Sequence, residues 1–217
     1  TSGSDWVGNG GSRAEPNNVF EIASGQTLTL RSDTTSGFLG GAILVANTVG
    51  DTRKTIKGGS LSSQFSTHYF DPDINNLYRV TNDLFIHNYA DPVNQGGGVF
   101  TIESNIVNNP ASPTTPLNFV HSGTGWTKMT RATPTGPGYS YTGTTYFTGG
   151  VIWATDPNKL GATPTAVDSD NWFFNGGTLR IADMTNSEEA VVASVPVSQT
   201  LSSNRGITIG GDGAYID

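Results

Sequence analysis

Cysteine is absent from this chain of 217 residues. Disulfides, thiolate metal sites and thiol nucleophiles are therefore excluded together, so stability must come from packing and from strand hydrogen bonds. Charged residues are also scarce, because they make up 13% of the chain against roughly 25% in an average soluble protein. No stretch approaches the roughly 20 consecutive apolar residues of a membrane-spanning helix, and we expect no membrane span. This composition is typical of a β-rich extracellular protein whose faces carry hydroxyl and amide groups.

Positive charge is sparse and scattered. Lys and Arg number 11 against 18 Asp and Glu, which gives a formal net charge of −7. Proteins hold nucleic acids largely through clustered Lys and Arg side chains on the phosphates, so we expect no nucleic-acid partner. The histidines His68, His87 and His121 are not paired at the spacing of a zinc site. This spacing argues against a catalytic zinc site. For the chain as a whole we expect no metal, no cofactor and no enzymatic activity.

Helical periodicity is nearly missing, and only 187–190 has the composition of a short helical turn. Apolar and polar residues alternate instead, as at Phe20, Ile22 and Leu28, which share one parity. The run 42–46 is continuously apolar and predicts a buried strand. Further strands are predicted over 19–30, 84–88, 99–103, 106–107, 117–120, 139–148, 151–153, 174–181, 191–197, 207–209 and 215–216.

Glycine marks the turns between these strands. The chain has 28 glycines, and the Gly-Gly turns read from the pattern, at 58, 97, 149 and 176, are spaced at irregular intervals. Short strands separated by such turns predict an all-β fold of the β-solenoid type, which tolerates unequal repeats because each coil contacts only its neighbours. A sandwich-like first half is the alternative. We expect one β-solenoid domain over 19–217, preceded by an arm or cap over 1–18 that carries a single large apolar residue, Trp6.

The second half of the chain resembles a known bacterial family. The stretch LNFVHSGTGWTKM at 117–129 is similar to a strand of the autotransporter-associated β-strand repeat, and YTGTTYFTGG at 141–150 is similar to its next step. The match continues in order through KLGATP, FNGGTLR and SNRGITI, and it is weak over 31–116. Trp126 departs from the family, which usually has a small or aliphatic residue there. The resemblance implies a right-handed parallel β-helix, secreted to the bacterial surface, without catalytic residues.

The two ends of the chain are similar to consecutive parts of that repeat. In the family, a segment like 207–217 usually continues into a strand like the one found here at 20–30. A solenoid end without a cap exposes unpaired strand edges, and a tail that fits a head produces open fibres. We therefore expect copies of the chain to stack head to tail into a filament, fibre or sheath. The expected interface residues are Trp6, Val19, Phe20, Ile22, Leu28, Leu30, Ile207, Ile209, Tyr215 and Ile216. Segment boundaries that simply fall between repeats would leave the same pattern.

A second hypothesis is a surface adhesin that binds glycans. Aromatic rings stack on the apolar faces of sugars. The residues that could form such a platform, or could instead belong to the core, are Trp6, Trp126, Trp153, Trp172, Tyr139, Tyr141 and Tyr146.

Carboxylates offer weaker candidates. Asp71 and Asp73 could bind Ca²⁺ through oxygen ligands, but their neighbouring proline favours a turn role. Asp212 lies in a Gly-rich turn, as one copy without partners. A polysaccharide lyase or hydrolase needs clustered carboxylates. The acidic concentrations that could serve are Asp168, Asp170, Glu188 and Glu189, and their turn-like segments favour solvated loops.

Overall fold

A computed structural model of the chain describes residues 17–31, 41–45, 53–64, 70–71, 76–77, 82–89, 99–132, 136–182 and 199–217. Within these residues nearly every element is a β-strand, and the helical element is the short 3-10 turn η1 (Pro157–Lys159). The expected all-β class is therefore confirmed. Of the arm expected over 1–18, residues 1–16 lie outside the described residues, as does the expected helical turn at 187–190, whereas Asn17 and Asn18 belong to strand β1.

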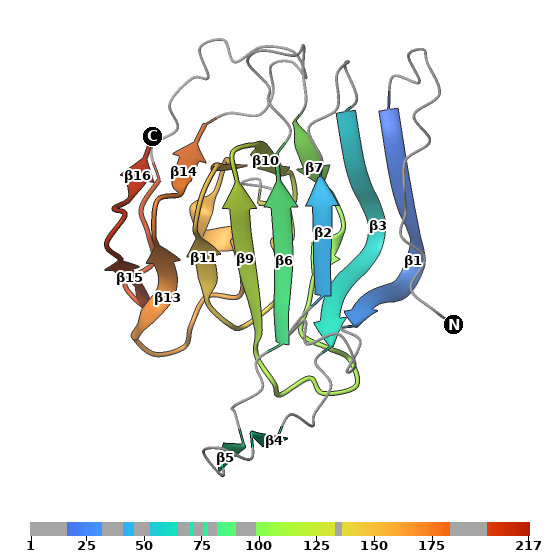
Figure 1. Cartoon of the computed structure of the whole chain (residues 1–217), viewed down its shortest axis with the longest axis horizontal. Helices are drawn as coiled ribbons and strands as arrows, with labels where there is room; N and C mark the ends of the chain where they lie inside the picture. Colours follow the sequence, from blue (N-terminus) through green and yellow to red (C-terminus); the bar gives the residue numbers. More distant parts are fainter. Residues whose placement is uncertain are drawn as a thin grey trace.

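Two parallel sheets make up the fold (Figure 1). The eight-stranded sheet contains β1 (Asn17–Arg31), β3 (Arg53–Gln64), β7 (Phe100–Ile102), β8 (Asn105–Ile106), β10 (Trp126–Met129), β12 (Val151–Ala154), β14 (Thr178–Ile181) and β16 (Tyr215–Ile216). The six-stranded sheet contains β2 (Gly41–Val45), β6 (Asn82–Asn88), β9 (Leu117–Gly123), β11 (Thr145–Phe147), β13 (Asp168–Phe174) and β15 (Arg205–Ile209). A small antiparallel pair, β4 (Phe70–Asp71) and β5 (Asn76–Leu77), stands apart from both.

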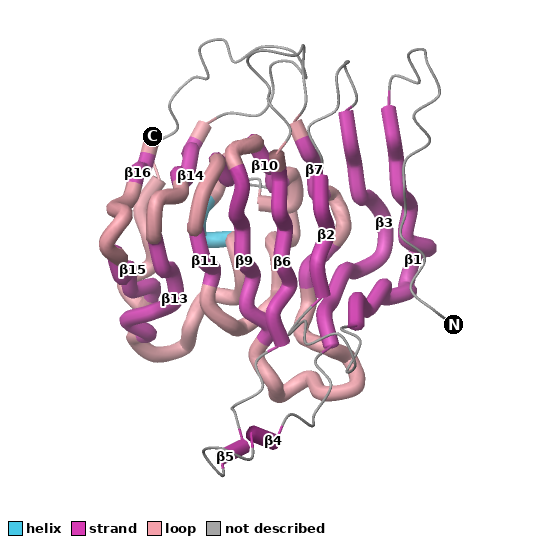
Figure 2. Tube along the Cα trace, viewed as in Figure 1, coloured by secondary structure: helices cyan, strands magenta, loops and turns pink. Residues whose placement is uncertain are grey.

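The chain alternates between the two sheets. Apart from β7 and β8, which share a sheet, each strand of the two sheets is followed by a strand of the other one, and its hydrogen-bonded partners come from the adjacent turns of the chain. In register, Phe119 of β9 pairs with Thr145 of β11, which pairs with Trp172 of β13. The strands of the first half continue the same two sheets, since β1 pairs with β3 and β2 pairs with β6 (Figure 2). Both sheets are open, with β1 and β16 at the edges of one and β2 and β15 at the edges of the other.

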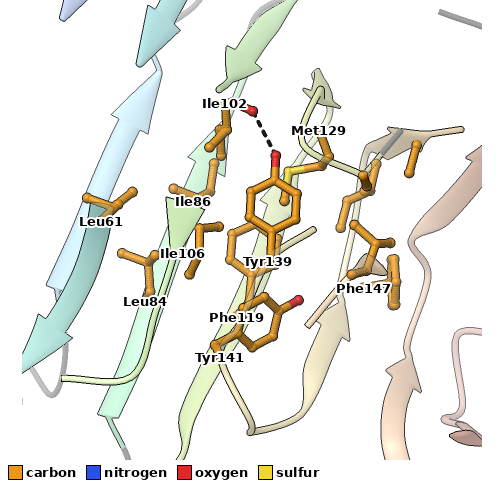
Figure 3. Packing of buried hydrophobic residues seen from close by; sticks show 14 of the residues in the cluster. Leu61, Leu84, Ile86, Ile102, Ile106, Phe119, Met129, Tyr139, Tyr141 and Phe147 are labelled. Atoms are coloured by element: carbon orange, nitrogen blue, oxygen red, sulfur yellow. Dashed lines mark hydrogen bonds between the residues drawn. The ribbon is translucent and has the colours of Figure 1, made fainter. Parts of the chain in front are cut away.

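Side-chain alternation places the core between the sheets. Along β6 and β9, buried side chains alternate with half-buried ones. Because the strands are in register, buried positions line up from strand to strand. Phe147 and Phe174 stack with ring centroids 4.1 Å apart. The Tyr139 hydroxyl donates a hydrogen bond to the Ile102 carbonyl at 2.7 Å, in the same core (Figure 3). Each fully buried aromatic or aliphatic side chain contributes about 1.5–3 kcal/mol, so these stacks account for the stability that disulfides do not supply.

Close approach between successive turns requires glycine at the bends. Gly123 ends β9 with φ +95°, and a Cβ there would collide with the Asn88 carbonyl oxygen of the preceding turn. Gly58 within β3 has φ +75° and would collide in the same way with the Ile22 carbonyl. Both positions need a backbone conformation that L-residues rarely adopt. Larger side chains are therefore excluded both by this conformation and by the collision of their Cβ atoms.

Some sequence predictions differ from the structure. The run 42–46 does form a strand, β2, but the prediction that it is buried is wrong: Leu44 is 67% exposed. The reason is that β2 is an edge strand whose alternate side chains face outward. The predicted strand 139–148 is strand only at Thr145–Phe147. The stretch before it is irregular, although Tyr139 and Tyr141 are buried.

Candidate binding surfaces

An aromatic stripe crosses the outer face of the six-stranded sheet. Pairing aligns one outward residue from each strand into a single row. This aromatic stripe consists of Ala42, Phe85, Val120, Tyr146, Phe173 and Thr208. The rings of Tyr146 and Phe173 lie 5.6 Å apart at 49°, and both side chains are half-buried. Figures 1 and 2 show β6, β9 and β11 side by side with no described element crossing in front of them.

Polar side chains flank the stripe on both sides. On one side, Asn118 donates to the Asp83 carboxylate at 2.8 Å and accepts the Thr144 backbone N–H at 2.9 Å. On the other side, the ring of His87 stacks on Phe85 at 5.7 Å, and its Nδ1 lies 2.6 Å from the Ser122 hydroxyl. The stripe is therefore an apolar lane between two rows of hydrogen-bonding groups.

The outer face of the eight-stranded sheet carries a different cluster, made of Trp126, Lys128, Trp153 and Arg180. Register places Lys128 next to Trp153, and Trp153 next to Arg180. The Lys128 ammonium lies 5.2 Å from the Trp153 ring centre, and the Arg180 guanidinium lies 5.2 Å from Trp126. Arg180 also forms an ion pair with Asp217 at 3.6 Å.

The two tryptophans of this cluster pack edge to face with ring centres 6.4 Å apart. Trp153 is only 6% exposed, and its indole N–H donates to the Ala182 carbonyl at 3.3 Å. The two cations pack over the Trp153 ring, and the ring is nearly buried. Trp153 therefore has no open face for a ligand.

The predicted aromatic platform is therefore divided among three places. Trp172, Tyr139 and Tyr141 are buried in the core, so for these three the alternative of a core position holds and the platform does not. Burial raises the pKa of Tyr141 to about 12, and its hydroxyl lies 2.7 Å from the Thr145 hydroxyl. Trp126 and Trp153 lie on one outer face and Tyr146 on the other, while Trp6 lies outside the described residues.

Phe85 and Phe173 were missed by sequence reasoning. Their outward parity could be read from the alternation in β6 and β13. Their alignment with Tyr146 depends on pairing between strands that lie far apart in the chain.

A buried polar network joins the two sheets through His121. Its Nδ1–H donates to the Gly149 carbonyl at 2.9 Å, and its Nε2 accepts from the Thr127 hydroxyl at 2.8 Å. The Asn88 amide also donates to that hydroxyl, at 3.1 Å, and to the Trp126 carbonyl at 2.8 Å. Burial lowers the pKa of His121 to about 4, which keeps the ring neutral. The network is saturated by protein groups, so its role is structural.

Arg205 forms a second buried polar centre. Its guanidinium lies 5.6 Å from the centre of the Trp172 ring, and desolvation lowers its pKa. It donates hydrogen bonds of 2.5 to 3.0 Å to the carbonyls of Asn158, Leu160 and Gly161 and to the side-chain oxygen of Asn171. This centre fastens β15 to the loop that follows β12.

The carboxylates considered for chemistry bond to neighbouring protein groups where they are described. Asp168 and Asp170 lie in strand β13, so the expectation of a turn-like, solvated loop there is wrong. Asp168 accepts the Asp170 backbone N–H at 3.2 Å, and Asp170 accepts the Thr208 hydroxyl at 2.7 Å. Asp212 accepts the Asn175 amide at 2.9 Å. Within the described ranges no group of three or more His, Asp or Glu could hold a metal ion. His68, Asp73, Glu188 and Glu189 lie outside these ranges, and the side chain of Asp71 is not described.

The residues expected at an assembly interface lie on edge strands. Ile209 of β15 pairs with buried Phe174 and Ile216 of β16 pairs with buried Leu179, yet they are 63% and 55% exposed. Ile207 and Tyr215 on the same strands are exposed too. On β1, at the opposite edge, Ile22 is buried. Half-buried neighbours on that strand are Phe20, Leu28 and Leu30. Only the strand position of Val19 is described, and Trp6 is outside the described residues.

Among the described segments, no helix is long and apolar enough to cross a bilayer.

One comparison with known proteins gives a match. Over 171 residues, which are 77% of this chain, the sequence is 29% identical to the protein named Adhesin BmaC autotransporter of Brucella suis biovar 1 (strain 1330). The chain spans 4% of the length of that relative. No family model matches the chain, and no solved structure matches it. The chain is thus similar to a surface autotransporter, and its membership of the narrower β-strand repeat family stays a prediction.

Proposed function

We propose that this chain acts in a bacterial surface adhesin, outside the cell, and that it contributes binding rather than catalysis. The observation that carries the proposal is the similarity to an autotransporter adhesin over 77% of the chain. The low charge, the absence of cysteine and the two parallel sheets are compatible with a rigid extracellular segment. This chain spans only a small part of the relative's length. The proposal is therefore limited to binding by the described surfaces of this chain.

The fold that we propose for this role is a right-handed β-solenoid. Alternation of successive strands between two sheets, with parallel pairing to the adjacent turns, supports coils stacked along one axis. Right-handed crossovers between parallel strands are by far the most common. Such a stack presents its outer faces as long, stiff surfaces.

Attachment of the purified chain to surfaces tests the adhesin function. Beads coated with the chain should adhere to epithelial cells or extracellular matrix, and beads coated with an unrelated all-β protein of similar charge should not. Soluble chain should compete with the coated beads. Equal attachment of the two kinds of bead would contradict the proposal.

Head-to-tail self-association is a second candidate. Ile209 and Ile216 have the inward parity of core residues but are exposed at the edges, and a further layer in register would bury them. A second copy, stacked by β1 on β16, is the occupant that we propose. Sedimentation of the chain at increasing concentration should show larger species, and Ile209→Asp should reduce them. Ser203→Asp, an exposed loop position, serves as the matched control. A monomer at every concentration would contradict the stacking.

A further inference from the structure

We infer that the aromatic stripe of the six-stranded sheet binds an extended neutral oligosaccharide, which lies across the strands. The inference rests on the proposed adhesin function and gives it a ligand class and a location. The carrying observation is the alignment of Phe85, Tyr146 and Phe173 in one outward row that has polar groups on both sides.

The ring faces provide the first half of the fit. The C–H faces of a pyranose ring are apolar and pack on aromatic rings, which are large and rigid. Tyr146 and Phe173 are neighbours in the row, and Phe85 lies beyond Val120. Six strands spaced about 4.8 Å apart give a row about 24 Å long. A chain of several sugars can therefore contact successive turns, and its axis runs along the stack.

The flanking groups provide the second half. Sugar hydroxyls project from the ring edge and both donate and accept hydrogen bonds, as amide, hydroxyl and imidazole groups do. Asn118 on one side, and Ser122 and His87 on the other, lie next to the apolar lane. Their existing contacts with Asp83 and with each other hold them in place, so a ligand meets oriented polar atoms.

Charge favours a neutral sugar over an acidic one. The acidic side chains near the row are Asp83 and Asp170, and the whole chain has a formal net charge of −7. Among the described cations, Lys128 and Arg180 lie on the other sheet, where they pack on tryptophan rings. Arg205 belongs to β15 of the six-stranded sheet but is buried. A sulfated or uronic-acid polymer would meet repulsion at this surface and no compensating cation from the row.

The width of the row favours a glycan over a protein. A stable protein partner buries about 800 Å² on each side. From β6 to β11 the apolar part of this face is one residue wide, since Asp83 and Asn118 lie on one side of it and His87 and Ser122 on the other. Leu44 of the edge strand β2 is an apolar exception, next to His87. A single sugar chain covers such a lane completely.

Affinity electrophoresis tests the inference. The chain would be run in native gels that contain hydroxyethyl cellulose, galactomannan or dextran, with heparin as the charged comparison. At least one neutral polymer should retard the wild-type chain, and heparin should not. Tyr146→Ala and Phe173→Ala should each weaken the binding about tenfold. Tyr146→Phe keeps the ring and should retain binding.

Two further variants separate binding from stability. Phe173→Leu keeps apolar bulk without a ring, so it should weaken binding while the melting temperature changes little. Trp126→Ala removes an aromatic residue from the opposite sheet and should leave binding unchanged. Binding lost in Phe173→Leu and kept in Trp126→Ala supports the inference. Failure of every neutral polymer to retard the wild type, or equal retardation of wild type and Phe173→Leu, would overturn it. Cell attachment without any polymer binding would overturn the glycan inference and leave the adhesin function standing. Absence of both cell attachment and polymer binding would contradict the adhesin function and the glycan inference.

Discussion

The outer faces of the two sheets use aromatic residues in opposite ways. On the six-stranded sheet, Tyr146 and Phe173 form an open row whose polar neighbours lie beside the rings. On the eight-stranded sheet, Trp153 is enclosed by Lys128, Arg180 and Trp126. The same alternation brought both sets outward. Whether an outward ring is available to a ligand thus depends on the residues that the neighbouring turns place beside it.

The largest expected effect is on the enclosed face. Trp153→Ala should lower the free energy of unfolding by about 3–5 kcal/mol, because a nearly buried ring leaves a cavity. Urea unfolding followed by far-ultraviolet circular dichroism measures the change. Trp153→Phe should recover part of the loss. If Trp153→Ala lowered the free energy of unfolding by less than Tyr146→Ala on the open face, the contrast between the two faces would be wrong.

The buried His121 network connects the two sheets. Protonation of His121 in acid should therefore destabilise both sheets together. The folded pKa near 4 lies below the ordinary value of about 6.5, so the unfolded state binds more protons between these values. The free energy of unfolding should therefore fall as the pH drops from about 6.5 to about 4, by on the order of 3 kcal/mol in total.

Substitution isolates the contribution of this histidine from that of the carboxylates. His121→Asn should be less stable at pH 7.5 and should show a smaller loss between pH 7.5 and pH 5. Tyr146→Phe, which changes no histidine, should keep the wild-type slope. Equal slopes in all three proteins would show that His121 does not titrate in this way.

The open face should tolerate loss of a ring better. Tyr146→Ala should cost about 1 kcal/mol, since the side chain is only half-buried and contacts Phe173 on one side. Thermal unfolding by calorimetry measures it. A loss as large as that of Trp153→Ala would mean that the row is a structural element of the sheet.

The smallest effect concerns the ion pair at the edge of the enclosed cluster. Asp217→Asn removes the partner of Arg180, and the exposed carboxylate should contribute less than about 1 kcal/mol. The difference from wild type should shrink when salt is raised to 1 M. A difference that is independent of salt would indicate a contact other than the ion pair.

The parts of this structure that sequence could predict are those fixed by local alternation. The inward side chains of β6 and β9 follow directly from period-two patterning. Tyr139 and Tyr141 could not be placed, because they are buried in irregular backbone. Their backbone N–H groups donate to carbonyls of other turns, Tyr139 to Lys159 and Tyr141 to Ile106. Leu44 was misplaced because an apolar run does not reveal that its strand lies at an edge. The stripe itself is a property of register, and register joins residues from separate turns.

The register between turns also bears on how such a surface changes over evolutionary time. Each turn adds one position to the row on the six-stranded sheet. Duplication of a turn would therefore lengthen the row by one contact, and deletion would shorten it, without redesign of the rest. For a ligand built of repeating units, each added contact forms within an existing complex. The gain in overall affinity is then set by the effective concentration of the next unit at its site. Duplication of a gene segment could thus change the affinity for such a ligand by more than any single substitution does.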